Sequence, residues 1–308
     1  MNHTAEVTDL LDAIPDLTFA GSVDGRRTFV TWRDGAVRLL DDRLSEIGAL
    51  KVELPQDSRV FTASGLGLIA LDAGGTVAVV FDGSLRRMDV VADAAVVLGD
   101  ALVLAVPGEA GHRLLLLDPA TGEVADEQAL DGPEARAHFH PHPEGSSAVL
   151  GLAMGQDGTQ AYGVDVVDSG LQVREILPGS DPVVLGFAPT GDRLLVAEDP
   201  SAPETLLVLS WPGMGELVRI ASDDVEAESG FGLAGCWIDE ERIALYATED
   251  ALLVADAGLN DPVRVDVELD FREDAEIERL VPLGRGGVAA AAWTPEGRIT
   301  LVAEFPSA

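Results

Sequence analysis

"LGFAPTGDRLLVAEDPSAPETLLVLSW", residues 185–211, contains three short apolar runs separated by polar and turn-forming residues. The runs are too short for helices and rich in Leu and Val, which is typical of buried β-strands. Pro189 and Gly191 lie between the first two runs, where they favour a tight turn. The stretch therefore predicts a strand, a turn, a strand, a loop and a third strand, in that order.

The same pattern repeats along the chain. The turn between the first two strands of a repeat falls at positions 25, 65, 99, 145, 191, 241 and 286, and it holds glycine everywhere except at Glu241. The intervals are 40, 34, 46, 46, 50 and 45 residues. After the third strand, most repeats have a turn that begins with Asp, at positions 41, 82, 118, 168 and 256, and then a fourth strand. Such turns need a side-chain acceptor or a positive φ, which Asp and Gly supply.

Seven units of four antiparallel strands predict an all-β, seven-bladed β-propeller, in which each blade covers the faces of its neighbours. We expect one domain over residues 1–308, with an N-terminal segment over 1–16 and seven repeats over 17–308. The last repeat ends after its third strand, so the N-terminal segment is expected to complete the last blade and close the ring. The alternative for this segment is a short amphipathic helix in "TAEVTDLLDAI".

Two stretches resemble the WD40-like and TolB-like propeller group. "FAPTGDRLLVA" is similar to the Phe-Ser-Pro-Asp-Gly turn of that group, and "LLLLDPATGEV" is similar to its third strand and the turn that follows. The Trp-Asp dipeptide of the group is missing, and Gly-His occurs once, at Gly111–His112, away from its usual place. The resemblance implies the fold and, as a function, a binding platform or less often an enzyme.

The composition limits the class of partner. The 308 residues include 54 acidic and 20 basic side chains, which gives a net charge of −34. Such a surface repels nucleic acid and anionic membranes, so we expect a protein partner with a basic surface, or no partner. Cys236 is the single cysteine, so an intrachain disulfide and a cysteine zinc site are excluded. The sequence shows neither a signal peptide nor a transmembrane run, and we expect a cytoplasmic protein.

The stretch "RAHFHPHPEG", residues 136–145, holds three of the five histidines. His138 and His140 are two residues apart on an expected strand, so both side chains point to one face and form half of a possible zinc or copper site. His142 is a third candidate ligand. The favoured alternative is a turn with incidental imidazoles, because no carboxylate or cysteine stands at ligand spacing. We therefore expect neither a metal nor a cofactor.

Two further features are candidates for partner binding. Trp32 and Trp293 end the second strands of the first and last repeats, and Arg33 follows Trp32, so the three residues are expected to form an exposed hot spot on one rim. The alternative is that each tryptophan packs between blades. The acidic segments 223–229 and 270–279 are expected to be solvated loops, with contact to a basic partner as the alternative.

Two functions follow from these observations. The first is a non-catalytic scaffold for protein interactions, because the expected inner strands are mostly apolar. The alternative is a propeller enzyme, a hydrolase or a lyase, that acts on a small molecule in the central channel with a metal held by His138 and His140. No nucleophile elbow, phosphate loop or zinc-protease motif is present, so no catalytic residue is assigned and an enzyme is the less favoured reading.

Overall fold

The computed structural model describes residues 3–4, 6–9, 17–23, 26–33, 36–55, 58–63, 67–81, 84–198, 204–225, 230–247, 251–260, 262–266, 276–283, 286–294 and 297–304. Over these ranges the chain is built of β-strands, with two short 3-10 turns at Gly155–Asp157 and Ser222–Val225. Within them, no helix has the length and apolar character needed to span a membrane. The chain divides into two compact units, Asp16–Gly179 and Met1–Pro15 together with Ser180–Ala308.

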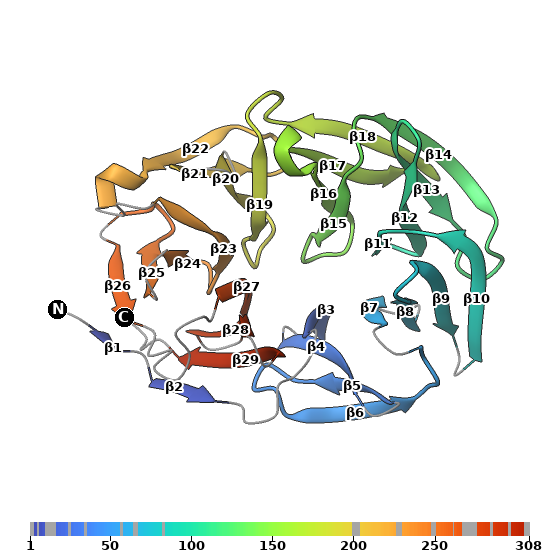
Figure 1. The fold of residues 1–308 in the computed structure, drawn as a ribbon, viewed down its shortest axis with the longest axis horizontal. Helices are drawn as coiled ribbons and strands as arrows, with labels where there is room; N and C mark the ends of the chain where they lie inside the picture. The colour runs from blue at the N-terminus through green and yellow to red at the C-terminus, as the bar shows by residue number, and fades with distance from the viewer. Residues whose placement is uncertain are drawn as a thin grey trace. The chain divides into compact units, whose positions relative to one another are not determined.

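The unit formed by residues 16–179 contains sheets of four consecutive antiparallel strands (Figure 1). Its strands are β3 (Thr18–Val23), β4 (Arg26–Arg33), β5 (Ala36–Leu40) and β6 (Glu46–Lys51); β7 (Arg59–Ala63), β8 (Gly67–Leu71), β9 (Thr76–Phe81) and β10 (Ser84–Val91); β11 (Ala94–Leu98), β12 (Ala101–Gly108), β13 (Gly111–Leu117) and β14 (Val124–Asp131); and β15 (Arg136–Pro141), β16 (Ser147–Ala153), β17 (Thr159–Val167) and β18 (Gly170–Ile176).

The other unit combines the C-terminal part of the chain with the N-terminal segment. Its strands are β19 (Pro182–Phe187), β20 (Arg193–Glu198), β21 (Thr205–Ser210) and β22 (Glu216–Ala221); β23 (Phe231–Trp237), β24 (Arg242–Ala247), β25 (Ala251–Asp256) and β26 (Val263–Asp266); and β27 (Glu276–Pro282), β28 (Gly287–Thr294) and β29 (Gly297–Glu304), joined by β1 (His3–Thr4) and β2 (Glu6–Asp9).

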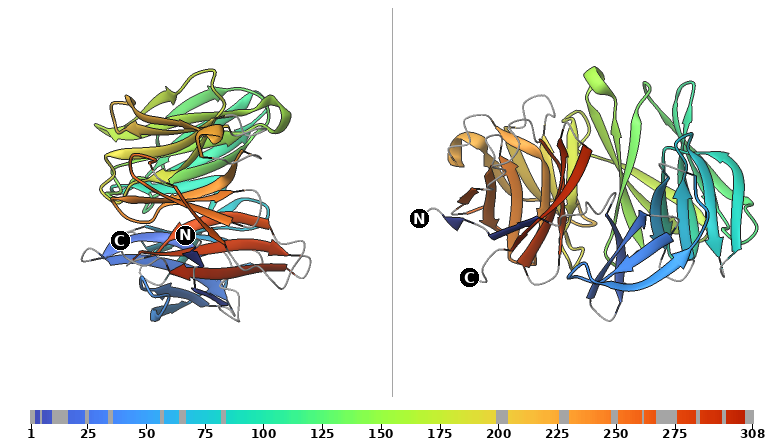
Figure 2. Two further views of the ribbon diagram at one scale, coloured as in Figure 1. Left: turned by 90° about the vertical axis from the view of Figure 1, so that its left-hand side faces the viewer. Right: turned by 60° about the horizontal axis from the view of Figure 1, so that its bottom comes forward.

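The prediction of seven four-stranded blades is wrong. The described residues form six four-stranded blades, and the remaining sheet, β23–β26, has five strands because β1 pairs with β26 in parallel. The N-terminal segment therefore serves two sheets: β2 pairs with β29 in antiparallel fashion and supplies the outer strand of the last blade. Figures 1 and 2 show this dark blue strand beside the red C-terminal strands. The alternative of a helix fails because residues 6–9 are extended; residues 10–16 lie outside the described part.

The apolar runs are continuous because both faces of a blade are buried. Along β12, Leu102 and Leu104 pack with the blade β7–β10, whereas Val103 and Ala105 pack with the blade β15–β18. Successive side chains of a strand point to opposite faces, so a strand covered on both sides is apolar at every position. The same alternation builds the apolar layers between successive blades within each unit.

The turns follow the predicted chemistry. The four described glycines at the predicted first-to-second strand turns all have a positive φ: Gly99, Gly145, Gly191 and Gly286. After the third strand, the Asp side chain accepts backbone N–H groups of its own turn at Asp41, Asp118 and Asp256. At Asp168 the backbone itself takes a positive φ of 50° instead. Both predicted uses of Asp are thus confirmed.

Candidate functional site

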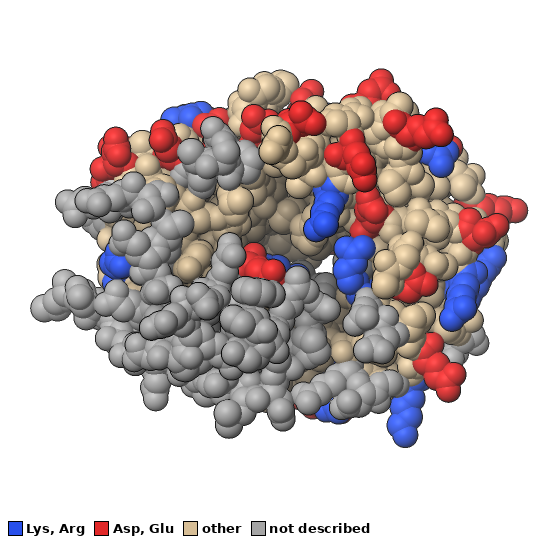
Figure 3. All heavy atoms as spheres, viewed as in Figure 1, with Lys and Arg blue, Asp and Glu red and all other residues tan. Residues whose placement is uncertain are grey.

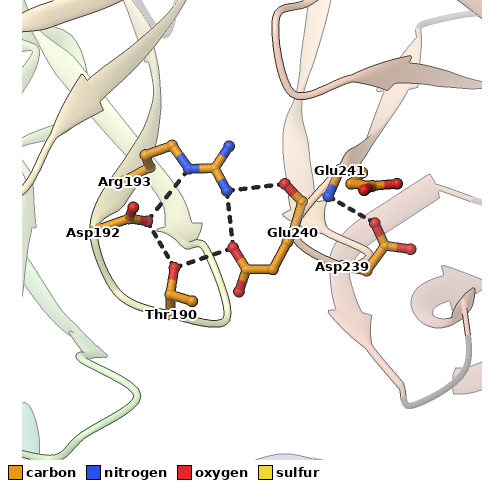
Figure 4. Close-up of polar contacts among 6 residues, drawn as sticks. All are labelled: Thr190, Asp192, Arg193, Asp239, Glu240 and Glu241. Atoms are coloured by element: carbon orange, nitrogen blue, oxygen red, sulfur yellow. Dashed lines mark hydrogen bonds and ion pairs between the residues drawn. The ribbon is translucent and has the colours of Figure 1, made fainter.

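Two successive blades of the C-terminal unit meet through their first-to-second strand turns. The turn between β19 and β20 is closed by the N–H of Gly191 donating to the carbonyl of Ala188, and Gly191 has a φ of 81°. In the turn between β23 and β24, the N–H of Glu241 donates to Oδ1 of Asp239. We call Thr190, Asp192, Arg193, Asp239, Glu240 and Glu241 the turn cluster; Figure 4 shows all six.

Arg193 is the centre of the turn cluster (Figure 4). Its Nη2 donates to Oε2 of Glu240 at 2.8 Å and to the carbonyl of Glu240 at 2.9 Å, and its Nε donates to Oδ1 of Asp192 at 3.3 Å. The hydroxyl of Thr190 lies 2.7 Å from Oδ1 of Asp192 and 3.0 Å from Oε2 of Glu240. Arg193 and Thr190, from one blade, therefore hold a carboxylate of the next blade.

A buried aromatic ring supports this arginine. The guanidinium carbon of Arg193 lies 4.6 Å from the centre of the Trp237 ring, and Trp237 is buried at the end of β23. A cation over an indole face is favourable, and more so where water is partly excluded. The side chain of Arg193 is 21% exposed, so the ion pair with Glu240 is stronger than one on open surface.

Two aspartates of the turn cluster, Asp192 and Asp239, have lowered pKa values. The hydroxyl of Thr190 and the guanidinium of Arg193 lower the pKa of Asp192. Burial raises the pKa of Asp239, but the hydrogen bonds from Arg242 and from backbone N–H groups outweigh it and the pKa is lowered. Carboxylates with lowered pKa values are weak proton donors and weak bases near neutral pH. This arrangement is suited to accept hydrogen bonds from a cation rather than to transfer protons.

Replacing Arg193 with alanine is expected to destabilise the chain by about 1–2 kcal/mol, because Glu240 loses its charged donor in a partly buried position. Urea unfolding followed by circular dichroism measures the change. Arg113→Ala is the control, since Arg113 and Glu127 form an ion pair at 3.0 Å in which both side chains are nearly half exposed. It should cost less than about 1 kcal/mol. Equal losses in the two variants would show that the turn cluster does not stabilise the fold.

A backbone hydrogen bond joins two blades of the other unit through the corresponding turns. The N–H of Gly99, in the turn between β11 and β12, donates to the carbonyl of Gly145, in the turn between β15 and β16. These turns also carry exposed acidic residues, Asp100 and Glu144. The first-to-second strand turns of four blades therefore each carry negative charge, at Asp100, Glu144, Asp192 and Glu240. In each blade this charge lies at the end where the first and second strands are joined. Figure 3 shows that acidic side chains are spread over the visible face rather than gathered at one point.

The structure places the three candidate histidines in different surroundings. His138 is exposed and His140 half-buried on one face of β15, opposite the buried Ala137 and Phe139. Their rings are 4.8 Å apart between centres, as the strand spacing predicts. His142 is buried in the following turn, where its Nδ1 accepts the N–H of Glu144 at 3.2 Å. Among the described side chains, no group of three His, Cys, Asp or Glu residues has metal-binding geometry.

The predicted hot spot is described only in part. Trp32 is half-buried and packs against the apolar layer between β3–β6 and β7–β10. The side chains of Arg33 and Trp293 lie outside the described part, so the predicted rim patch stays a prediction. In the acidic segments, residues 223–225 belong to a 3-10 turn and 276–279 to β27, while residues 226–229 and 270–275 are not described.

Two contacts between residues far apart in the chain were not predicted from the sequence. His112 is buried and its Nε2 lies 2.9 Å from Oδ2 of Asp93, which precedes β11. The Gly-His dipeptide at 111–112 was the available signal for that pair. The contact between Arg193 and Glu240 joins residues 47 positions apart, and only the recurrence of turns in successive repeats pointed to it.

The sequence matches no protein-family model and no curated protein. Solved structures match the fold. A chain of the mitotic checkpoint complex matches with a TM-score of 0.63 and 13% identity, over 99% of this chain and 93% of that chain. The β-propeller domain of Cps50 (Swd1) from Myceliophteria thermophila matches with a TM-score of 0.59 and 13% identity, over 99% and 100%. The C-terminal WD40 domain of Sif2 matches with a TM-score of 0.59 and 11% identity, over 99% and 100%.

These similarities concern the fold. They show that the chain is an all-β protein of the β-propeller kind with four-stranded antiparallel blades, and they confirm the predicted WD40-like resemblance at the level of fold.

Proposed function

We propose that this chain is a non-catalytic scaffold for protein interactions, and that the acidic ends of its blades contact a partner with a basic surface. The observation that carries the proposal is the turn cluster, whose carboxylates are held by hydrogen bonds and yet remain accessible, and in which the pKa values of Asp192 and Asp239 are lowered. The side chain of Asp192 is 67% exposed, that of Asp239 is 40% exposed and that of Glu240 is 38% exposed. Pre-oriented ionised acceptors of this kind suit Lys and Arg side chains.

Three further facts support a protein partner. The structures that share the fold include a chain of a multiprotein complex, the mitotic checkpoint complex. The outer strands present exposed apolar side chains, such as Ile47 on β6 and Leu217 on β22. The net charge of −34 speeds encounter with a basic protein and disfavours nucleic acid. We also propose that the chain works in the cytoplasm, which rests on the sequence alone.

The test begins with affinity purification of partners from source cells on the full chain. Each recovered protein is then purified, and its affinity is measured against variants with a charge reversed at the proposed end: Asp100→Lys with Glu144→Lys, and separately Glu241→Lys. We expect each set to weaken binding at least about tenfold, which is 1.4 kcal/mol, and to reduce the dependence of the affinity on salt.

Antiparallel strands alternate in direction, so the second-to-third strand turns lie at the opposite end of each blade. Glu109 and Asp157 are exposed at these turns in the same two blades that carry Asp100 and Glu144. Glu109→Lys with Asp157→Lys is therefore the matched control and should leave the affinity unchanged. An equal loss in the control would contradict the proposed surface, and recovery of small molecules processed by the chain would contradict the scaffold function.

A further inference from the structure

The outer strand of the first blade, β6, is an open sheet edge. It is the last strand in the order β3-β4-β5-β6, and among the described residues it pairs with β5 alone (Figure 1). Five of its six residues are exposed, including Ile47 at 55% and Leu50 at 37%. The outward N–H and C=O groups of such an edge can pair with a further strand.

The other outer strands of this unit carry charge at their centres. The charged residues there are Arg86 and Arg87 on β10, Asp126 and Glu127 on β14, and Arg174 and Glu175 on β18. Charged side chains in an edge strand discourage pairing with another chain. In β6 the two charged residues, Glu46 and Lys51, stand at the ends, and the four residues between them are uncharged. The edge of β6 therefore lacks the central charge that protects the other three.

The pairing of β6 with β5 contains a β-bulge. Gly48 pairs with Leu39, whereas Glu46 pairs with Leu40, so Ile47 is an extra residue in β6. The residues of β6 thus occupy five successive positions along the strand: Glu46 together with Ile47, then Gly48, Ala49, Leu50 and Lys51.

These five positions place both charges on one face of the sheet. Side chains alternate between the two faces from one position to the next, so the first, third and fifth positions share a face. They hold Glu46, Ala49 and Lys51. Glu46 forms an ion pair with Arg38 at 2.9 Å, and Arg38 lies directly opposite Ala49, as this placement requires.

The strand is complementary to itself about its middle residue, Ala49. A two-fold axis at Ala49 sets β6 antiparallel to β6 of a second copy, with the first position of each strand opposite the fifth position of the other. Glu46 of each copy then lies opposite Lys51 of the other copy, on the same face. Leu50 lies opposite Gly48, which has no side chain and has nothing within 4 Å of an added Cβ. The pairing therefore joins opposite charges at both ends and leaves room for both leucines.

We propose that two copies of this chain form a symmetric dimer through antiparallel pairing of their β6 strands. Opposite charges directly across an antiparallel pair stabilise it. The contact is small and the net charge of −34 opposes the approach of a second copy, so we expect a weak dimer with a Kd of about 10–100 µM. The dimer does not rest on the proposed scaffold function, because no residue of β6 belongs to the turn cluster.

Sedimentation of the full chain at about 1 to 300 µM, in about 0.15 M salt, tests the proposal. We expect a reversible monomer–dimer equilibrium. Glu46→Lys places two lysines opposite each other at both ends of the contact, and Lys51→Glu places two glutamates there. Each variant alone should weaken dimerisation at least about tenfold. An equimolar mixture of the two variants should form a heterodimer with about the affinity of the parent, because each end then joins a lysine to a glutamate.

Glu127→Lys on β14 is the matched control. Glu127 forms an exposed ion pair with Arg113 at 3.0 Å, as Glu46 does with Arg38, so the control loses an equivalent ion pair and changes the net charge equally. It should leave dimerisation unchanged. A parent that stays monomeric over this range, an unchanged affinity in Glu46→Lys, an equal loss in Glu127→Lys, or a mixture without the heterodimer would each overturn the proposal. Circular dichroism of each variant establishes that a loss of dimer does not reflect unfolding.

Discussion

Replacement of Gly111 with alanine is expected to lower the free energy of unfolding by more than about 3 kcal/mol. Gly111 begins β13 with a φ of 121°, a conformation that side chains with a Cβ rarely adopt. A Cβ at this position would overlap the carbonyl oxygen of Leu130 and lie 2.8 Å from the backbone nitrogen of Gly132. Both obstacles are backbone atoms, one in β14 and one directly after it, so they cannot move aside without disturbing the pairing of β13 with β14.

Gly99→Ala in the same blade is the matched control. Gly99 also has a positive φ, 61°, but nothing lies within 4 Å of its missing Cβ. Alanine there should therefore cost only the conformational term of about 1 kcal/mol. Urea unfolding monitored by circular dichroism and by tryptophan fluorescence compares the two variants. Similar midpoints for both would mean that the steric overlap at residue 111 is relieved by a movement of the hairpin.

The second large effect is expected from Leu104→Ala. Leu104 is completely buried on β12 and packs into the apolar layer between the blades β7–β10 and β11–β14. Loss of its isopropyl group leaves a cavity between two twisted sheets that cannot close together without losing their strand pairing. We therefore expect a destabilisation of about 2–5 kcal/mol, measured by urea unfolding.

Val124→Ala provides the comparison within the same blade. Val124 begins the outer strand β14 and is 51% exposed. Its truncation should change stability by no more than about 0.5 kcal/mol. If the two variants were destabilised equally, the layer between these blades would not be the core of this unit.

The strands and turns were predictable because each depends on residues close in sequence. The apolar run of β12 predicts a buried strand from its own side chains, and the glycines at 99, 145, 191 and 286 predict turns because glycine, without a Cβ, adopts a positive φ readily. The five-stranded sheet was not predictable, because β1 contributes only His3 and Thr4 and pairs with residues more than 250 positions away. Two residues are too few to show a period of two.

The candidate site was less accessible to sequence reasoning. The sequence predicts ordinary turns at 190–193 and 239–242. The residues near one turn do not indicate which other turn its carboxylates contact. The same limit applies to Trp237. The sequence alone does not show whether a tryptophan at the end of a strand is exposed or is buried beneath an arginine. The position of His138 and His140 on one face of a strand, in contrast, follows from the two-residue period and is confirmed.

The pairing of β2 with β29 also has a consequence for synthesis of the chain. Residues 16–179 form a unit that is continuous in sequence, so it can fold while the ribosome is still adding later residues. Glu6–Asp9 are synthesised long before their partners at residues 301–304. The segment therefore cannot pair with β29 until those residues have been made. We expect pulse-labelled chains to acquire protease resistance first in residues 16–179, and in the other unit only after residue 304 has left the exit tunnel.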